Sequence, residues 1–162
     1  MKNNIALIHY WCYCGSMTIT RTTAKRRYNL ELDNNNHSVF NLNYHLIICV
    51  KYRRRVINDL IAAEIFGMFS RIGKSYHVTL SEGNHDVDHI HILMKAHPNS
   101  DLSRFIGAFK SASSRLIKKD HPEIRSKLWK EAFWSTSYCL LTVGGAPLSI
   151  LKAYIESQGE HQ

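Results

Sequence analysis

The sequence has few cysteines and no long apolar run, and each absence excludes a class of protein. Four cysteines scattered through 162 residues do not make the dense disulfide framework of a small secreted domain. We therefore expect a reducing, cytoplasmic setting. The apolar run near the start is broken by His9 and Tyr10, so it is a poor signal peptide and too short to span a bilayer. We expect no membrane segment.

Zinc-finger spacing is also missing. His9, Cys12 and Cys14 could be drawn together as a metal cluster. However, Cys-x-Cys lacks the usual two-residue gap, and no second pair with finger spacing follows. Zinc therefore remains the weaker alternative for this segment. We expect residues 1–37, which include the polar run "DNNNH", to form a loosely ordered N-terminal extension.

Acidic residues are in short supply. Lysine and arginine number 21 against 13 aspartates and glutamates, which gives a formal net charge of +8 and a pI near 9.4. This balance favours a polyanionic partner, such as nucleic acid or an anionic membrane surface. The chain is long enough for one compact domain with a core, and we assign that domain to residues 38–162.

Hydrophobic periodicity predicts an alternation of strands and helices after residue 38. The expected order is strand 39–50, a helix between Asn58 and Gly73, strands 76–83 and 88–95 joined by a turn around Gly83 and Asn84, a helix after residues 97–100, strand 135–143, and a helix over 148–158. This order lacks a strict βαβ series. It predicts an α+β fold, a ferredoxin-like or RRM-like antiparallel sheet with helices on one face.

The second of these helices should be amphipathic. Its predicted buried stripe consists of Leu102, Phe105, Ile106, Phe109, Ala112, Leu116 and Ile117, and its outer face carries Arg104, Ser111, Arg115 and Lys118. We predict that these cations neutralise phosphates, and a solvated charged face is the alternative.

The stretch "DVDHIHILMK" places two histidines on one face of a strand. His89 and His91 point one way while Ile90 and Ile92 point the other. Two neutral imidazoles at this spacing can hold one divalent ion, and Asp88 could orient a ring. Alternatively, the histidines face solvent or lie under a loop. A metal site would need a third ligand.

The last predicted helix offers a candidate for that ligand. Tyr154 and Gln158 are four residues apart in "LKAYIESQ", so they are neighbours on one helix face. Tyr154 could also be an ordinary tyrosine at the edge of the core.

Five blocks, taken together, resemble a known family. They are "YHLIICVKYRRRVI", "DHIHIL", "FKSASSRLI", "LWKEAFWSTSYCLLTV" and "YIESQ", which occur in this order between residues 44 and 158. This combination resembles the single-tyrosine HUH transposases of the insertion-sequence 200/605 family, the TnpA type. Val87 stands where many members have proline, and residues 1–37 have no counterpart.

The resemblance implies a site and an activity. It places the HUH motif on His89, Ile90 and His91, the nucleophilic tyrosine on Tyr154 in a mobile C-terminal helix, and a further metal ligand on Gln158. It implies a homodimer with active sites composed in trans, which binds imperfect hairpins in single-stranded DNA. Cleavage would need Mg²⁺ or Mn²⁺ and would form a 5′-phosphotyrosine with a free 3′-OH.

Cations and aromatic side chains elsewhere could bind the DNA. The run Lys51, Tyr52, Arg53, Arg54 and Arg55 directly follows the first strand, and such groups neutralise phosphates. Arg104, Lys110, Arg115 and Lys118 are candidates on the second helix. Tyr52, Trp129, Phe133 and Trp134 could stack on unpaired bases, although the tryptophans could equally belong to the core.

Three other functions compete with a DNA transposase. A domesticated nuclease would use the same chemistry without an element to move. A non-catalytic RRM-like nucleic-acid-binding module would need an aromatic strand motif that the sequence lacks. A histidine-triad hydrolase would need another histidine near position 93, where Leu93 stands.

Overall fold

A computed structural model describes residues 32–34 and 37–143 of the chain. The elements, in chain order, are β1 (Asp33–Asn34), β2 (Val39–Phe40), β3 (Leu42–Cys49), the 3₁₀ helix η1 (Lys51–Arg53), α1 (Asp59–Gly73), η2 (Lys74–Tyr76), β4 (Val78–His85), β5 (His89–Ala96), α2 (Leu102–Asp120), η3 (Pro122–Lys127) and β6 (Cys139–Thr142).

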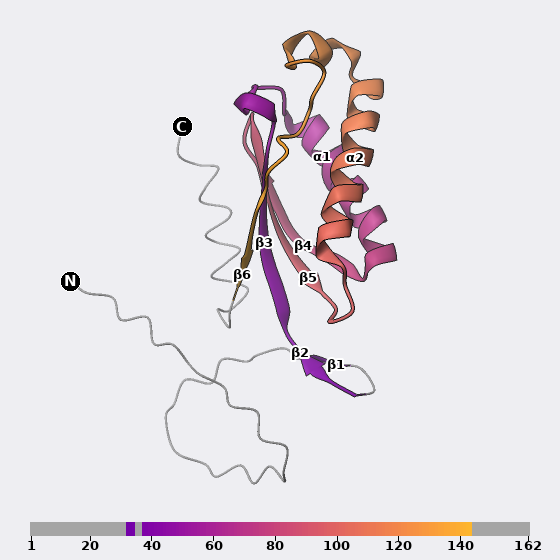
Figure 1. Cartoon of the computed structure of the whole chain (residues 1–162). Coiled ribbons are helices and arrows are strands. Elements are labelled where there is room, and N and C mark those ends of the chain that lie inside the picture. Colours follow the sequence, from indigo (N-terminus) through magenta and orange to yellow (C-terminus); the bar gives the residue numbers. More distant parts are fainter. Residues whose placement is uncertain (1–31, 35–36, 144–162) are drawn as a thin grey trace, which may run out of the picture.

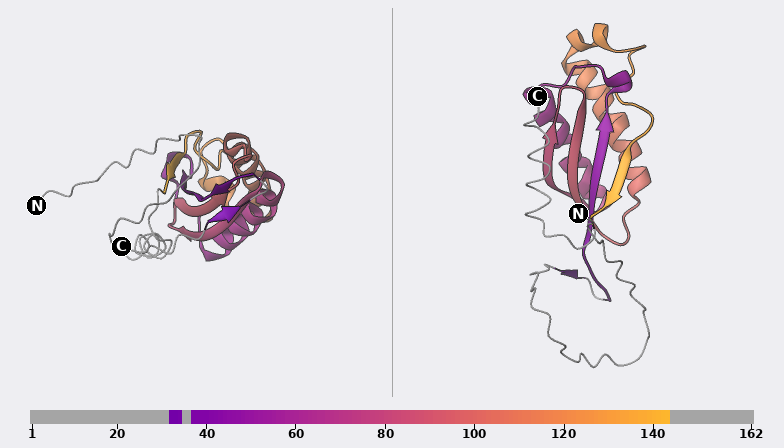
Figure 2. Two further views of the ribbon diagram at one scale, coloured as in Figure 1. Left: turned by 90° about the horizontal axis from the view of Figure 1, so that it is seen from below. Right: turned by 90° about the vertical axis from the view of Figure 1, so that its left-hand side faces the viewer.

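Four of the strands form one sheet in the order β4-β5-β3-β6, and β1 and β2 pair separately. Every neighbouring pair in it is antiparallel. Helices α1 and α2 lie side by side against one face of this sheet (Figure 1; the strands are seen side by side in the right view of Figure 2). The predicted ferredoxin-like arrangement is therefore confirmed.

The core lies between the sheet and the two helices. From β3 it receives Leu46 and Ile48, and from β5 it receives Ile90 and Ile92, all fully buried. The alternate residues of these strands point to the opposite face. The phase predicted for β5, with Ile90 and Ile92 opposite to His89 and His91, is therefore correct.

The predicted start of α1 is also correct. The side chain of Asn58 accepts a hydrogen bond from the backbone N–H of Ile61 at 2.9 Å, as expected for a helix N-cap. Ile65 and Phe69, which lie one turn apart on this helix, are fully buried.

The stripe of α2 needs one correction. Ser113 is fully buried, whereas Ala112, which was predicted to be buried, is only partly covered. Ser113 donates a hydrogen bond to the Phe109 carbonyl at 2.7 Å and accepts one from Trp134 Nε1 at 2.9 Å. These two bonds satisfy the hydroxyl, so a polar residue is stable at a core position.

The predicted turn around Gly83 and Asn84 is wrong. Both residues lie inside β4, where they pair with Ile92 and His91, and the chain reverses after His85. Gly83 is needed for packing instead, because a Cβ atom there would lie 2.8 Å from the ring of Phe66 on α1. Glycine in a strand commonly marks such a close approach.

The fourth strand is shorter than predicted. Of the expected strand 135–143, the part that is a strand in the structure is Cys139–Thr142, which pairs with β3. Ahead of the sheet, Asp33 and Asn34 of the expected extension pair with Phe40 and Val39.

Within residues 37–143, no helix has the length and apolar character that a membrane crossing requires. Residues 1–31 and 35–36 of the N-terminal extension, which include His9, Cys12 and Cys14, lie outside the described residues, as does the predicted helix 148–158.

Candidate active site

His89 and His91 project from β5 on the sheet face opposite α1 and α2. Their ring centroids are 4.9 Å apart and the rings are steeply inclined to each other, at 70°. His91 is buried and His89 is partly covered. Strand geometry thus brings the two predicted ligands together, as their spacing requires.

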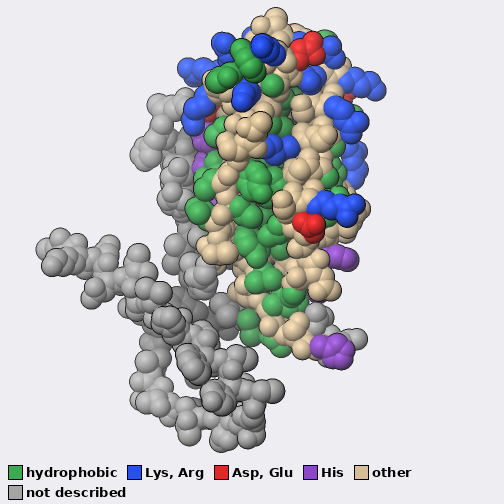
Figure 3. Space-filling model, in the orientation of Figure 1, with side chains coloured by type: hydrophobic (Ala, Val, Ile, Leu, Met, Phe, Trp, Pro, Cys, Tyr) green, Lys and Arg blue, Asp and Glu red, His purple; other side chains and the backbone are tan. Residues whose placement is uncertain are grey.

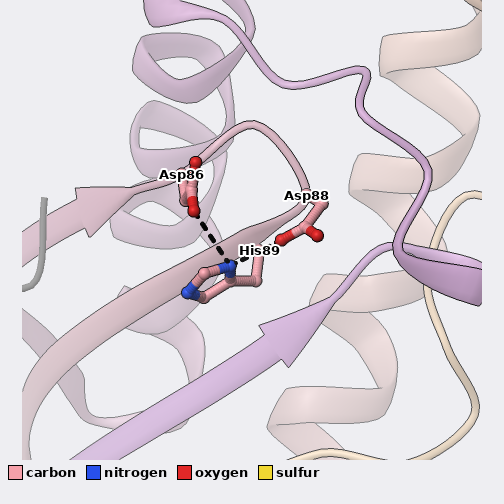
Figure 4. Close-up of side chains that lie close together, drawn as sticks. All are labelled: Asp86, Asp88 and His89. Carbon is pink, nitrogen blue, oxygen red and sulfur yellow. Dashed lines mark hydrogen bonds and ion pairs between the residues drawn. The ribbon is translucent and has the colours of Figure 1, made fainter. Parts of the chain in front are cut away.

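Two aspartates next to the histidines lie at the reversal between β4 and β5. Asp88 Oδ1 lies 2.6 Å from His89 Nδ1, and Asp86 Oδ2 lies 3.9 Å from the same nitrogen (Figure 4). Asp88 therefore orients the His89 ring, in the role suggested for it above. The backbone N–H of Val87 donates to Asp86 Oδ1 at 2.6 Å, a bond that proline at this position could not make.

The reversal is tied to the segment between β3 and α1. The Val87 carbonyl accepts hydrogen bonds from the backbone N–H groups of Val56 and Ile57, both at 2.9 Å. Arg53 makes two hydrogen bonds to the Asp88 carboxylate, Nε at 2.9 Å and Nη2 at 3.1 Å. Such a bidentate pair fixes a carboxylate in direction as well as in charge. Arg53 is therefore an ion-pair partner in the site, a role that the sequence did not indicate.

His45 is a further residue that sequence reasoning missed. It projects from β3 on the same sheet face, and its Nε2 lies 3.0 Å from His91 Nδ1 in a buried hydrogen bond. The two rings are stacked, with centroids 5.2 Å apart. The period of β3 was the available signal, because it places His45 opposite to buried Leu46 and thus on the histidine face.

Burial keeps the two paired histidines neutral. The pKa of His91 falls from 6.5 to about 4, first because of burial and second because of the nearby His89 and His45. Burial also lowers the pKa of His45. A neutral imidazole is the form that binds a metal ion.

These contacts suit a divalent metal. His89 Nδ1 is held by Asp88 and His91 Nδ1 is held by His45, which leaves Nε2 of each ring as the ligand atom. A ring held through its second nitrogen is the usual arrangement of metal-binding histidines.

Asp86, Asp88 and His89 form another possible site, with ligand atoms within 4.8 Å of one another. In that group, however, Arg53 already neutralises Asp88. Tyr154 and Gln158 lie outside the described residues.

The predicted DNA-binding cations separate into two groups. Residues 51–55 are joined to the histidine site through Arg53. The α2 cations belong to the helical layer, on the other side of the sheet. Two of them bind backbone carbonyls, Lys110 that of Thr136 and Lys118 that of Glu131, each at 2.8 Å. Arg104 and Arg115 are exposed.

The predicted stacking aromatics separate in the same way. Phe133 and Trp134 are buried in the core. Tyr52 is 62% exposed and Trp129 is 38% exposed. Only Tyr52 and Trp129 of these four can therefore reach a base.

Comparison with known proteins identifies relatives over most of the chain. Residues 38–158 match the family described as "Transposase IS200 like". The chain is 33% identical to the ISDra2 transposase TnpA of Deinococcus radiodurans, over 82% of this chain and 95% of that protein. It is 27% identical to the transposase for insertion sequence element IS200 of Salmonella typhimurium, over 76% of this chain and 81% of that protein.

Solved structures show the same fold. A crystal structure from Deinococcus radiodurans R1, described as that of a candidate transposase, has a TM-score of 0.63 and 30% identity and covers 78% of this chain and 98% of that chain. A REP-associated tyrosine transposase bound to a REP hairpin has a TM-score of 0.51 and 8% identity, with 76% of this chain and 68% of that chain covered. At that identity the second likeness shows the fold alone.

Proposed function

The chain belongs to the IS200-like transposase family, and on that premise we propose that it binds hairpin ends of an insertion sequence as single-stranded DNA, cuts them and rejoins the strands. The observation that carries the proposal is the fixed pair of histidines on β5. Each has its Nδ1 bound to a neighbour, Asp88 for His89 and His45 for His91. This leaves two Nε2 atoms for one metal ion.

The metal in this proposal is Mg²⁺ or Mn²⁺, bound by His89, His91 and Gln158. When bound, it would polarise the non-bridging oxygens of the scissile phosphate and offset charge on the leaving 3′-oxygen. His45 and Asp88 hold the two imidazoles in position, and Arg53 balances the charge of Asp88. The sheet face thus carries a set of ligands, for which a non-catalytic RRM-like module would have no use.

Tyr154 is the proposed nucleophile. Its hydroxyl oxygen forms a bond to phosphorus as the bond from phosphorus to the 3′-oxygen breaks. The products are a 5′-phosphotyrosine and a free 3′-OH: the tyrosine gives its proton to solvent or to a base, and the leaving 3′-oxygen takes one up from solvent. Because the ester keeps the energy of the phosphodiester bond, a 3′-OH of another strand can reverse the reaction. This property suits strand transfer.

We propose a homodimer in which Tyr154 and Gln158 of one chain complete the histidine pair of the other. The transposase domain would span residues 38–162, with residues 1–37 as an extension. A cytoplasmic location follows from cysteine usage.

The direct test uses labelled single-stranded DNA from the genomic flanks of the gene. We expect a covalent protein–DNA adduct on a denaturing gel with Mg²⁺ and none with EDTA. Tyr154→Phe should abolish the adduct and leave hairpin affinity nearly unchanged, since the hydroxyl is the nucleophile and not a main DNA contact. A wild-type amount of adduct from Tyr154→Phe would exclude this residue. Rejoined product would distinguish a transposase from a nuclease of the same chemistry.

A further inference from the structure

A basic pocket lies beside the histidine site, between two turns that are far apart in the sequence. Its volume is about 580 Å³. One wall is the turn Tyr52–Arg55, and the other is the segment Ser126–Lys130. The pocket contains the two exposed aromatic side chains identified above, together with several cations.

The two aromatic rings contact each other at the pocket. Tyr52 and Trp129 meet edge to face, with centroids 5.0 Å apart. Lys51 Nζ lies 5.0 Å from the Tyr52 ring centroid, and Lys130 Nζ lies 4.7 Å from that of Trp129. A ligand can therefore reach the faces of both rings. A lysine ammonium group lies over each ring, and because a lysine side chain is flexible, a flat base could take its place.

Positive charge surrounds these rings. Arg54, Arg55, Lys127 and Lys130 all line the pocket, while Arg53 is paired with Asp88. Most of the Lys and Arg side chains visible in Figure 3 gather at the upper end of the molecule, where η1 and η3 lie in Figure 1. Cations around an accessible aromatic pair favour a ligand that has both a phosphate and a flat ring.

The two turns adopt an uncommon backbone conformation. Of the five non-glycine residues with positive φ in the described part of the chain, four lie here: Tyr52 and Arg53 in one turn, and Lys130 and Glu131 in the other. Backbone of this kind persists only where its surroundings hold it, and it concentrates at binding and catalytic sites.

The surrounding hydrogen bonds supply that support. Lys51 N–H donates to the Phe133 carbonyl at 2.8 Å, and Arg53 N–H donates to the Val50 carbonyl at 2.9 Å. Lys118 Nζ donates to the Glu131 carbonyl at 2.8 Å. The pocket is therefore organised before a ligand arrives, which lowers the entropy cost of binding.

Short contacts connect this pocket to the histidine site. Arg53 belongs to the same turn as Tyr52, and its Nε lies 2.9 Å from Asp88, whose Oδ1 lies 2.6 Å from His89 Nδ1. A DNA strand whose phosphate lies at the histidines would thus pass next to the pocket.

We propose that the pocket binds one unpaired nucleotide of the single-stranded DNA substrate, close to the scissile phosphate. Its base stacks on Trp129 and Tyr52, and its phosphates contact Arg54, Arg55 and Lys130. The inference rests on the proposed function, because it assumes a single-stranded substrate at the histidines. It adds a site that positions the strand by stacking, which requires no base pairing.

The test measures binding by the full chain in EDTA, so that no cleavage takes place. Two labelled probes are compared, an oligothymidine and an abasic oligomer of the same length, which carries the same phosphates without bases. Wild type should bind the oligothymidine more tightly. Trp129→Leu should weaken oligothymidine binding about tenfold and leave abasic binding unchanged, whereas Trp129→Phe should retain most of the affinity. Equal affinity of wild type and Trp129→Leu for oligothymidine would overturn the proposal.

Two further variants keep the test decisive. Tyr52→Asn, in which the new residue tolerates the left-handed backbone, should lose base-dependent affinity as Trp129→Leu does, so a folding defect at Trp129 would not end the test. Arg54→Ala with Arg55→Ala should weaken both probes and reduce the slope of log affinity against log salt by about 1.4. Arg71→Ala, which removes an arginine from α1 on the other side of the sheet, is the control. It should change neither the affinity for the two probes nor the salt slope.

The outcomes separate the two proposals. Base-independent binding in wild type would make the pocket a phosphate site alone and would overturn stacking, while the proposed function would stand. Failure of wild type to bind either probe, or the genomic single strand, would remove both proposals.

Discussion

His45 determines which nitrogen of His91 is left free to bind the proposed metal. Its Nε2 lies 3.0 Å from His91 Nδ1 in a buried contact, and a bound Nδ1 leaves Nε2 as the ligand atom. We therefore expect His45→Ala to weaken Mn²⁺ binding about 10- to 100-fold, as measured by titration calorimetry without DNA. His45→Gln can still accept a hydrogen bond and should recover part of that affinity. Unchanged Mn²⁺ affinity in both variants would reduce His45 to a packing residue.

Burial of His91 also predicts how stability depends on pH. Its pKa is 6.5 in its ordinary state and about 4 in the folded protein, so between these values the unfolded chain binds more protons. The part of the folding stability that depends on a neutral His91 is fully present above pH 6.5 and is lost as pH falls towards 4. We expect this residue to account for a loss of up to about 3 kcal/mol in the free energy of unfolding.

Urea unfolding in EDTA at several pH values between 7 and 4 measures this effect. His91→Gln removes the titrating ring, so its free energy of unfolding should fall less steeply than that of wild type over this range. Parallel curves for the two proteins would show that His91 is not protonated on unfolding.

At the scale of elements, two glycines make opposite predictions for the same substitution. Gly83 lies in β4, where a Cβ atom would lie 2.8 Å from the Phe66 ring, whereas Gly67 is on α1, where a Cβ atom would have no neighbour within 4 Å. Gly83→Ala should lower the free energy of unfolding by about 1 to 3 kcal/mol through overpacking. Gly67→Ala should raise it by up to about 1 kcal/mol, because alanine is the better helix former.

Denaturant unfolding of both variants provides the measurement, and Gly67→Ala is the matched control for Gly83→Ala. Adding Phe66→Leu to Gly83→Ala should restore part of the loss. A neutral Gly83→Ala would mean that the Phe66 ring moves aside at no cost, and the explanation given for this glycine would then fail.

Gly83 also shows where sequence reasoning reached its limit. The phase of β5 follows from local periodicity and the start of α1 at Asn58 from a local capping signal, and both predictions were correct. Glycine and asparagine in succession are a strong local signal for a turn, but here the reason for the glycine is a ring from another element. The same holds for Ser113, which is stable in the core because Trp134 donates to it. Contacts between distant segments leave no local pattern.

The same distinction between local patterns and distant contacts applies to the residues of the candidate site. His89 and His91 were predictable because their spacing is local. His45, which contacts His91, and Arg53, which contacts Asp88, are 46 and 35 residues away from these partners, so local spacing does not reveal the two contacts. His45 could have been suspected from its strand phase. Arg53 could not, since a cation in a basic run is usually solvated.

At the scale of the whole molecule, the proposed dimer raises the question of which chain supplies the proposed nucleophile, Tyr154. Gly144, Gly145 and Ala146 precede Pro147 in the sequence, and three extended residues reach at most about 10 Å. From this sequence we expect the predicted helix 148–158 to be able to reorient without travelling freely. This fits the proposal that Tyr154 and Gln158 act on the histidine pair of a second copy.

Mixing two inactive variants tests this assembly. Tyr154→Phe keeps both histidines, and His91→Ala keeps Tyr154 and Gln158, so a heterodimer assembled in trans contains one intact site. We expect cleavage to return when the two proteins are mixed under conditions that allow subunit exchange, up to about half the activity of a wild-type dimer if all dimers were mixed, since each has one of two sites. With sites in cis, each chain would combine one intact half with one damaged half, and every combination would stay inactive. Absence of cleavage in heterodimers verified by differential tags would therefore assign the site to a single chain, and a monomer at working concentration would remove the basis for composition in trans.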